Sequence, residues 1–430
     1  MLDRVLGQGA SARAAAMPSG AHGAAESHSD AVPPLRVLIL CDRFPFPLQN
    51  GQNLRIYNYV SRLRGACAFD LVCYGDAPPP PELSPLFGSI ECFPMPTKHA
   101  RTGLSRVRHA FSVTHMLLES DAVREHLERI LEERNYDVVW VSGWAMIVNV
   151  PAGARHRVLA DAVDDGVLEF WRELRRSRTP TRFLLMLKWL FMNYRFERHY
   201  FGPAAQCLFV SEVDAEMFQR VCPAARVAVV HNGVDAEQFR PGKGDVDAHH
   251  IVFEGKMNFA PNADGIVAFC HELLPAIREA VPDVRVTLVG MDPPPEVRAL
   301  ASPWVEVTGY VDDVRPYVDR AAVFICPLRK GAGIKNKVLQ AWAMGKAVVA
   351  TPASVGGLSA RDGENILIRP FDRSFADAVI ALLRDPVRAA ALGKCARSTI
   401  EERYTWDRKA REIGTLLRSV ASRAAEADHA

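Results

Sequence analysis

Short apolar runs recur along the chain, and a segment long enough to form a helix follows most of them. In the first half of the chain the runs occupy residues 36–41, 70–74, 136–141, 157–160, 206–210 and 227–230. Continuous apolar runs are typical of strands that are buried on both faces of a parallel sheet. Strands that alternate with helices therefore predict an α/β fold with helices on both faces of the sheet.

A polar break between residues 231 and 249 separates this series from a second one. The break contains Asn232-Gly233 and Pro241-Gly242, which are turn signals. Further strands are predicted at 250–254, 284–289, 305–308, 323–326 and 347–350, and helices at 372–384, 387–402 and 405–423. The chain therefore contains two strand-and-helix series in tandem.

We expect each series to form one doubly wound domain, the first over residues 35–240 and the second over residues 241–430. A length of 430 residues agrees with two domains of about 200 residues each. Residues 1–34 are rich in Ala, Gly, Ser and Pro and lack the continuous apolar region of a secretory signal. We expect them to form a disordered tail.

Charge and cysteine content argue against several classes of protein. The formal net charge is only +2, whereas a nucleic-acid-binding domain is expected to carry a strongly basic face. The nine cysteines are scattered singly and form no CxxC pair, which favours reduced thiols in a cytoplasmic protein. No run of about eighteen apolar residues is present, so no helix is predicted to span a membrane.

A nicotinamide-dependent oxidoreductase is a natural candidate for any doubly wound sheet. Such an enzyme needs a GxGxxG turn after its first strand. The loop after Cys41 has Gly51 as its only glycine, and the loop after Glu254 has only Gly255. The sequence therefore argues against this class.

Cationic side chains gather at the predicted carboxyl end of the second sheet. Lys335 and Lys337 lie near the start of a short predicted helix, just after a turn that contains Gly331 and Gly333, and Lys256 directly follows a predicted strand. Three ammonium groups near one helix N-terminus repel one another unless an anion lies between them. The pattern predicts a diphosphate site, although a solvated lysine at a strand end remains the simpler interpretation of Lys256.

Several segments of the chain follow one another in the order of a known family. They are residues 231–235, 253–256, 288–290, 307–311, 337–351 and 404–406. Together they resemble the donor domain of glycosyltransferase family 4, a group of retaining enzymes with the GT-B fold. The loop at 42–55, together with Met257-Asn258 and Pro261-Asn262, resembles a bacterial subgroup associated with exosortase and exopolysaccharide gene clusters.

The resemblance implies two Rossmann-like domains that face each other across a cleft. The first would bind the acceptor and the second the nucleotide-sugar donor, and the last helix would pack back on the first domain. The implied activity is a metal-independent, hexosyltransferase-type reaction that needs no cofactor. The sugar would pass to a saccharide or a lipid-linked acceptor in bacterial polysaccharide biosynthesis.

The resemblance also implies roles for individual residues. Lys256 and Lys337 would neutralise the diphosphate of the donor, which is the main catalytic device in such a reaction. Further donor contacts fall at Gly255, Gly331, Ala332, Gly333, Ile334, Lys335 and Gln340. On the acceptor side, the resemblance points to the loop residues Asn50, Gly51 and Arg55.

The chain departs from the family at two of these positions. The family carries two glutamates with seven residues between them, where this chain has Ala332 and Gln340. Gln340 keeps an acceptor oxygen for the ribose hydroxyls but lacks the charge, so we expect donor binding to be weaker by about 1–2 kcal/mol. The loss of both acids motivates one alternative, a non-catalytic nucleotide-sugar-binding homologue. A nucleotide-sugar epimerase of the same fold is the second alternative, and the missing acids argue against it because such enzymes use acids in the cleft for proton transfer.

Four acidic residues follow predicted strands of the first domain. Asp42 comes after the first strand, and Asp161, Asp164 and Asp165 come after the fourth. Asp42 and Asp161 are candidate catalytic residues, the latter as a general base. The alternatives are turn formation for Asp42 and helix capping for the other three. Their spacing fits no strong metal-ligand motif, and no metal site is predicted.

The segment 172–198 combines a long apolar stretch with a cluster of arginines at its start. One interpretation is a buried helix with a solvated basic end. The other is an amphipathic element that contacts the inner membrane near a lipid-linked acceptor. The sequence leaves both interpretations open.

Overall fold

The computed structural model describes residues 33–48, 51–76, 78–96, 119–330 and 334–429. The predicted tail lies almost wholly outside these ranges, as do Asn50 and the stretch 331–333. From Pro34 onward the chain forms one compact unit that contains two parallel sheets. The chain passes from the first sheet to the second between Val229 and Asp247.

The first sheet has seven parallel strands in the order β3-β2-β1-β4-β5-β6-β7. Its strands are β1 (Leu35–Cys41), β2 (Cys67–Tyr74), β3 (Ile90–Phe93), β4 (Val138–Ser142), β5 (Val158–Val163), β6 (Gln206–Phe209) and β7 (Val227–Val229). Its helices are α1 (Gly51–Leu63), α3 (Asp121–Glu133), α4 (Gly166–Arg176), α5 (Pro180–Phe196) and α6 (Glu212–Val221), with short helical turns at Ile147–Asn149, Ala152–Arg157 and Glu197–Phe201.

The second sheet has six parallel strands in the order β10-β9-β8-β11-β12-β13. Its strands are β8 (Asp247–Glu254), β9 (Arg285–Val289), β10 (Val305–Gly309), β11 (Ala321–Cys326), β12 (Ala347–Ala350) and β13 (Leu367–Ile368). Its helices are α7 (Ala260–Ala268), α8 (Leu274–Ala280), α9 (Pro295–Arg298), α10 (Arg315–Arg320), α11 (Asn336–Ala343), α12 (Arg373–Arg384) and α13 (Pro386–Arg403), with turns at Phe269–Leu273 and Pro352–Ser354.

The side chains of β1 show why helices cover both faces of the first sheet. Val37 and Ile39 point into one apolar core, and Leu38 and Leu40 point into another, because successive side chains of a strand face opposite ways. All four are fully buried. Both faces therefore need a helical cover, and the predicted doubly wound architecture is confirmed.

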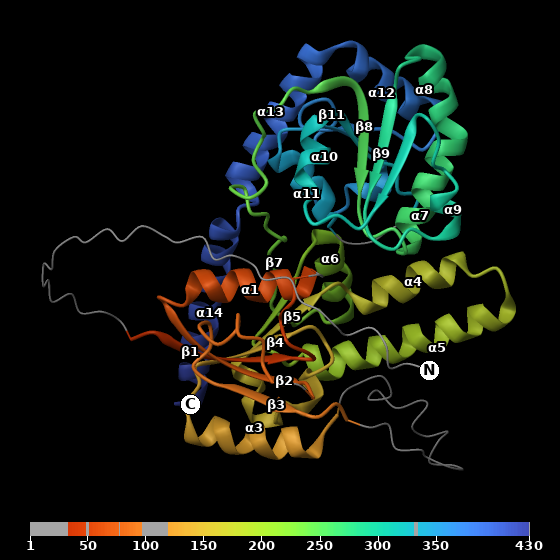
Figure 1. Ribbon diagram of the computed structural model, residues 1–430. Helices are drawn as coiled ribbons and strands as arrows, with labels where there is room; N and C mark the ends of the chain where they lie inside the picture. Colours follow the sequence, from red (N-terminus) through yellow and green to blue (C-terminus); the bar gives the residue numbers. More distant parts are fainter. Residues whose placement is uncertain (1–32, 49–50, 77, 97–118, 331–333, 430) are drawn as a thin grey trace, which may run out of the picture. The chain divides into compact units, whose positions relative to one another are not determined.

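The last helix of the chain, α14 (Trp406–Asp428), packs against the first sheet's helix α1 (Figure 1). Trp406, Ile413 and Leu417 join the same apolar core as Tyr59 of α1. The Trp406 and Tyr59 rings meet edge to face, with their centroids 5.5 Å apart. The expectation that the last helix returns to the first domain is confirmed.

Helices α4 and α5 form a hairpin, and Figure 1 shows them running alongside each other. The α5 helix is not the buried helix that was one of the two interpretations of this segment. Only Met192 and Phe196 of its residues are buried. No helix in the described part of the chain has the length and apolar character needed to cross a membrane.

Candidate functional site

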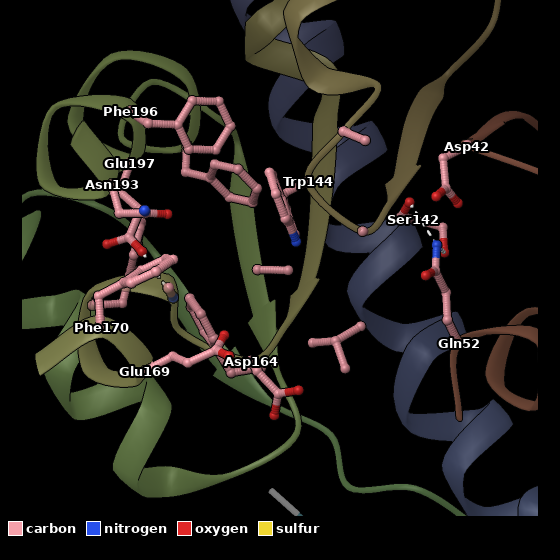
Figure 2. Close-up of a pocket in the computed structure, with 18 of the residues that line it drawn as sticks. Asp42, Gln52, Ser142, Trp144, Asp164, Glu169, Phe170, Asn193, Phe196 and Glu197 are labelled. Carbon is pink, nitrogen blue, oxygen red and sulfur yellow. Dashed lines mark hydrogen bonds between the residues drawn. The ribbon is translucent and has the colours of Figure 1, made fainter. Parts of the chain in front are cut away.

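A pocket of about 690 Å³ opens at the carboxyl ends of the strands in the first sheet. Its lining residues all come from the range 42–218. The polar side chains that line it belong to Asp42, Arg43, Gln52, Ser142, Asp164, Glu169, Asn193 and Glu197. Figure 2 shows Asp42 and Ser142 on one side of the pocket, Asn193 and Glu197 on the other, and Trp144 between them. Ligands of parallel α/β sheets bind at this end of the strands.

A strained turn after β5 places Asp164 at the pocket. Val163 has a φ of +70°, which is unusual for a β-branched residue. The Asp164 N–H donates to the Ala162 carbonyl oxygen at 3.0 Å and closes a three-residue turn around Val163. Such turns are rare and strained. Strain of this kind is concentrated at functional sites, which makes Asp164 the strand-end acid of greatest interest.

The electrostatic environment of Asp164 favours a protonation change near neutral pH. Desolvation in the pocket, together with the nearby carboxylates of Asp214 and Glu169, raises the pKa of Asp164 to about 6. The side chain nevertheless remains accessible. Within the physiological pH range, Asp164 can therefore donate a hydrogen bond when it is protonated and only accept hydrogen bonds when it is ionised.

Two buried carboxyl groups stand at the N-terminus of α4. Asp165 caps this helix by accepting the Leu168 N–H, and Glu197 Oε1 accepts the N–H groups of Gly166 at 3.1 Å and Val167 at 3.2 Å. Burial raises the pKa of Asp165 to about 7 and raises the pKa of Glu197 well above its usual range. Glu197 Oε2 is buried and has no hydrogen-bond partner among the described residues.

The opposite wall is formed by α1 and by the ends of β1 and β4. Gln52 Nε2 donates to the Ser142 carbonyl oxygen at 3.0 Å and to the Ser142 hydroxyl at 3.2 Å. Asp42 follows β1 and forms an ion pair with Arg43 at 3.1 Å. The structure therefore places Asp42 in the pocket, where its carboxylate can accept hydrogen bonds.

Aromatic rings complete the pocket. Trp144 follows β4 directly after Gly143, and its ring meets Phe196 edge to face at a centroid distance of 6.2 Å. Phe170 of α4 also lines the pocket and stacks on Trp189 of α5. A pocket that combines a few carboxylates with aromatic faces is suited to a ligand that has both hydroxyl groups and apolar C–H faces.

Asp161 and Arg55 do not line this pocket. The Arg55 Nη2 atom lies 3.1 Å and 3.3 Å from the two Asp161 carboxylate oxygens, and both side chains are only 1% exposed. Arg55 lies within α1 and not on a loop, and it also donates to the Val230 carbonyl oxygen at 2.9 Å. The prediction of Asp161 as a base and of Arg55 as an acceptor-side loop residue is therefore wrong, because the two neutralise each other inside the core.

The cationic group of the second sheet centres on Lys337 in the first turn of α11. Its Nζ donates to the Glu254 carbonyl oxygen at 2.7 Å and to Asn262 Oδ1 at 3.0 Å, and it lies 4.1 Å from the centre of the Phe253 ring. Burial lowers the Lys337 pKa, while the Glu254 carboxylate opposes this shift. The structure thus brings Lys337 to the carboxyl end of β8.

Gly255 allows this approach. Its φ of +152° is rarely adopted by residues with a side chain, and a Cβ atom there would lie 2.2 Å from Lys337 Nζ. No other residue type fits between β8 and the ammonium group without displacing one of them. The glycine is therefore part of the cationic site, although it carries no chemical group of its own.

The other residues predicted on the donor side lie around the same element. Lys335 immediately precedes α11, and burial lowers its pKa. Ile334 packs against the apolar core of the second sheet, Gln340 is half-buried on α11, and Lys256 is exposed just after β8. Gly331, Ala332 and Gly333 lie outside the described residues.

Gly51, predicted on the acceptor-side loop, is the first residue of α1. Asn50, predicted beside it, lies outside the described residues. Among the residues that the structure describes, no three His, Cys, Asp or Glu side chains are grouped so as to hold a metal ion.

Sequence reasoning missed Trp144, Asn193 and Glu197 as pocket residues. Trp144 could have been predicted, because it lies just beyond the carboxyl end of a predicted strand, where ligands of parallel sheets bind. Asn193 and Glu197 belong to the region of α5 and the turn after it, whose place beside the sheet no local pattern indicates. Their role emerges only from the folding of the α4–α5 hairpin over the pocket.

Comparison with known proteins defines the class to which the chain belongs. Residues 49–238 match the model of Glycosyltransferase Family 4, and residues 248–385 match the model of Glycosyl transferases group 1. With its two parallel-sheet domains, the chain is a glycosyltransferase of the GT-B fold. Its first domain is similar to the family 4 model and its second domain to the group 1 model.

Three similar proteins illustrate this relationship. The GDP-mannose-dependent alpha-(1-6)-phosphatidylinositol monomannoside mannosyltransferase of Mycobacterium tuberculosis is 28% identical over 89% of this chain and 98% of its own. Sucrose-phosphate synthase from Thermosynechococcus elongatus has a similar fold, with a TM-score of 0.65 and 19% identity over 90% of this chain and 99% of its own. Anabaena HepE, solved in complex with UDP and glucose, has a TM-score of 0.62 and 16% identity over 90% of this chain and all of its own.

Proposed function

We propose that this glycosyltransferase is a retaining enzyme of bacterial polysaccharide biosynthesis. It moves a sugar from a nucleotide-diphosphate sugar to a saccharide or lipid-linked acceptor, and it uses neither a metal ion nor a cofactor. It works in the cytoplasm at the inner face of the membrane. The resemblance to the exopolysaccharide-associated subgroup supports this setting.

The observation that carries the donor assignment is the position of Lys337. Its ammonium group lies at the N-terminus of α11, where the helix dipole also favours an anion, and the two atoms that it binds are uncharged oxygens. A diphosphate that approaches this end of β8 gains a charge-assisted hydrogen bond. As the bond between the sugar and the diphosphate breaks, negative charge develops on the leaving group, and Lys337 stabilises it.

The pocket of the first sheet is proposed to bind the acceptor. Asp164 offers carboxylate oxygens to sugar hydroxyl groups, and Trp144 offers an aromatic face. In its ionised form Asp164 accepts a hydrogen bond from the reacting acceptor hydroxyl, which makes the hydroxyl oxygen a better nucleophile. This role replaces the one that the sequence suggested for Asp161.

The test is to incubate the full chain with UDP-, GDP- and ADP-sugars and a crude lipid extract, and to follow nucleotide release. Similar proteins are named for GDP-mannose or were solved with UDP, so neither base can be omitted. We expect nucleoside diphosphate release that depends on the extract and a product with the donor's anomeric configuration. Lys337→Met should weaken binding of the matching nucleoside diphosphate at least about tenfold, whereas Lys394→Met, on the exposed side of α13, should not.

The same assay tests the two alternatives, of which the absence of the family acids at Ala332 and Gln340 motivates only the non-catalytic one. Binding of a nucleotide-sugar without turnover would instead assign a non-catalytic homologue. Isomerisation of the sugar without acceptor would assign an epimerase. An inverted product would contradict the retaining mechanism while leaving the glycosyltransferase class intact.

A further inference from the structure

Helix α5 presents large apolar side chains to solvent along much of its length. Those of Phe183, Leu184, Leu185, Leu187, Phe191 and Tyr194 are between 39% and 64% exposed. Trp171 on α4 is exposed as well. Single exposed apolar residues are normal on the surface of a protein in water. A cluster of them is unusual, and such a patch marks an interaction surface.

The exposed residues belong to one element, the hairpin of α4 and α5. A stack between Phe170 and Trp189, with centroids 6.2 Å apart and ring planes 27° apart, joins the two helices. An apolar groove of about 440 Å³ includes Trp171, Leu187, Phe191 and also Met217 of α6 in its walls. The surface is therefore defined by the fold of the hairpin and does not depend on the orientation of a single side chain.

The charge of the hairpin identifies the partner. Residues 166–198 contain eight Arg and Lys residues and three Glu residues, which gives +5, whereas the whole chain carries only +2. The basic residues are concentrated around the turn between the helices, at Arg175, Arg176, Arg178 and Arg182. Glu173 pairs with Arg182 at 2.7 Å and with Arg176 at 3.6 Å, so most of the positive charge remains available.

We propose that the α4–α5 hairpin docks the protein on an anionic lipid bilayer. The apolar side chains of α5 enter the boundary between headgroups and acyl chains, and the arginines around the turn contact lipid phosphates. Tyr194 and Trp171 have the amphipathic character of residues found at this boundary. A second copy of this chain is a poor occupant of the surface, because two hairpins of charge +5 would repel each other.

Docking through this hairpin places the acceptor pocket at the membrane. Glu169, Phe170, Asn193 and Glu197, which line the pocket, come from α4, α5 and the turn that follows α5. A lipid-linked saccharide could therefore reach the pocket while its lipid remains in the bilayer. This consequence rests on the proposed function, whereas the docking itself does not.

The test is sedimentation of the full chain with vesicles of phosphatidylglycerol and phosphatidylethanolamine, compared with vesicles of phosphatidylcholine. We expect binding to the anionic vesicles at low salt and weaker binding at high salt. Leu184→Glu combined with Leu187→Glu should weaken this binding at least about tenfold, because two apolar side chains are lost and two repelled charges are added.

Val246→Glu combined with Val387→Glu is the matched control. Both valines are exposed apolar residues outside the hairpin, and this variant adds the same charge. We expect it to bind the vesicles as the parent chain does. The proposal is overturned if the parent chain does not bind anionic vesicles at low salt, or if both double variants bind equally well.

Two further measurements distinguish a failure of the docking proposal from a failure of the proposed function. Self-association of the parent chain that disappears in Leu184→Glu/Leu187→Glu, measured by sedimentation velocity, would assign the surface to a second copy and overturn the proposal. Nucleoside diphosphate binding without vesicles should be the same in the parent and this variant. A parent chain that docks on vesicles but binds no nucleotide would contradict the proposed function and leave the docking assignment standing.

Discussion

At the scale of single residues, Asp164 gives the clearest pH-dependent prediction. Its pKa of about 6 lies above the usual aspartate range, and the proposed role requires the ionised form. The value of kcat/KM for sugar transfer should therefore rise with pH through about 6 and level off above it. Asp164→Asn should lower kcat/KM about 100-fold and abolish this part of the pH profile.

Glu169→Gln provides the control for Asp164. Glu169 lines the same pocket and is also accessible, so its loss changes the charge of the pocket without removing the proposed hydrogen-bond acceptor. The pH profile of Glu169→Gln should keep its rise but shift it to lower pH, because the Glu169 carboxylate no longer raises the pKa of Asp164. If Asp164→Asn retains the rise near pH 6, another group is responsible and the assignment fails.

Residues 161–165 show where sequence reasoning at this scale stops. The predicted strand ended at residue 160, so Asp161 was expected in a loop, but β5 continues to Val163. A buried aspartate within a parallel strand is tolerated only with a partner, and Arg55 lies 106 positions away in the sequence. No local pattern indicates such a pair. The sequence named the right group of acids but could not say which of them faces the pocket.

At the scale of elements, the contact between β8 and α11 gives a second prediction. Gly255→Ala adds a Cβ atom that collides with Lys337 Nζ and also strains the backbone at a φ of +152°. We expect the free energy of unfolding to fall by about 1–3 kcal/mol. Binding of nucleoside diphosphate should weaken as well, because Lys337 must move. Chemical denaturation and calorimetric titration measure the two effects.

Gly363→Ala is the control that separates backbone strain from the collision of a new Cβ atom with a neighbouring side chain. Gly363 has a φ of +78°, but a Cβ atom there would meet nothing within 4 Å. This variant should lose less stability than Gly255→Ala, because only the backbone strain remains, and it should keep its affinity for the nucleotide. Unchanged nucleotide affinity in Gly255→Ala would show that the Lys337 contact with β8 does not matter for the donor.

Most elements were predictable because their apolar patterns are local. The missed strands, β3 and β13, lie at sheet edges. β3 is only half-buried, and its Glu91 binds Arg134 at 3.0 Å, so it lacks the continuous apolar run of a central strand. β13 has two residues and no pattern of its own. For α5 the sequence showed an apolar helix, but its exposure depends on neighbours that the sequence does not specify.

At the scale of the whole molecule, the last helix of the chain belongs to the first domain, although it follows the second domain in the sequence. The chain completes its second sheet and then returns with α14 to the first. The resemblance to family 4 enzymes implied this return, whereas the sequence pattern by itself predicted only a helix at 405–423. The first domain is therefore incomplete without the last residues of the chain.

Leu417→Ala tests this return. Leu417 is fully buried in the core that α14 shares with α1, so the free energy of unfolding should fall by about 2–5 kcal/mol. Hydrogen exchange should become faster in α1 and β1, while β8 and β11 of the second sheet keep their protection. Leu184→Ala removes the same atoms from an exposed position and should change stability little. Faster exchange in β8 with no change in α1 would assign α14 to the second domain and contradict the observed packing.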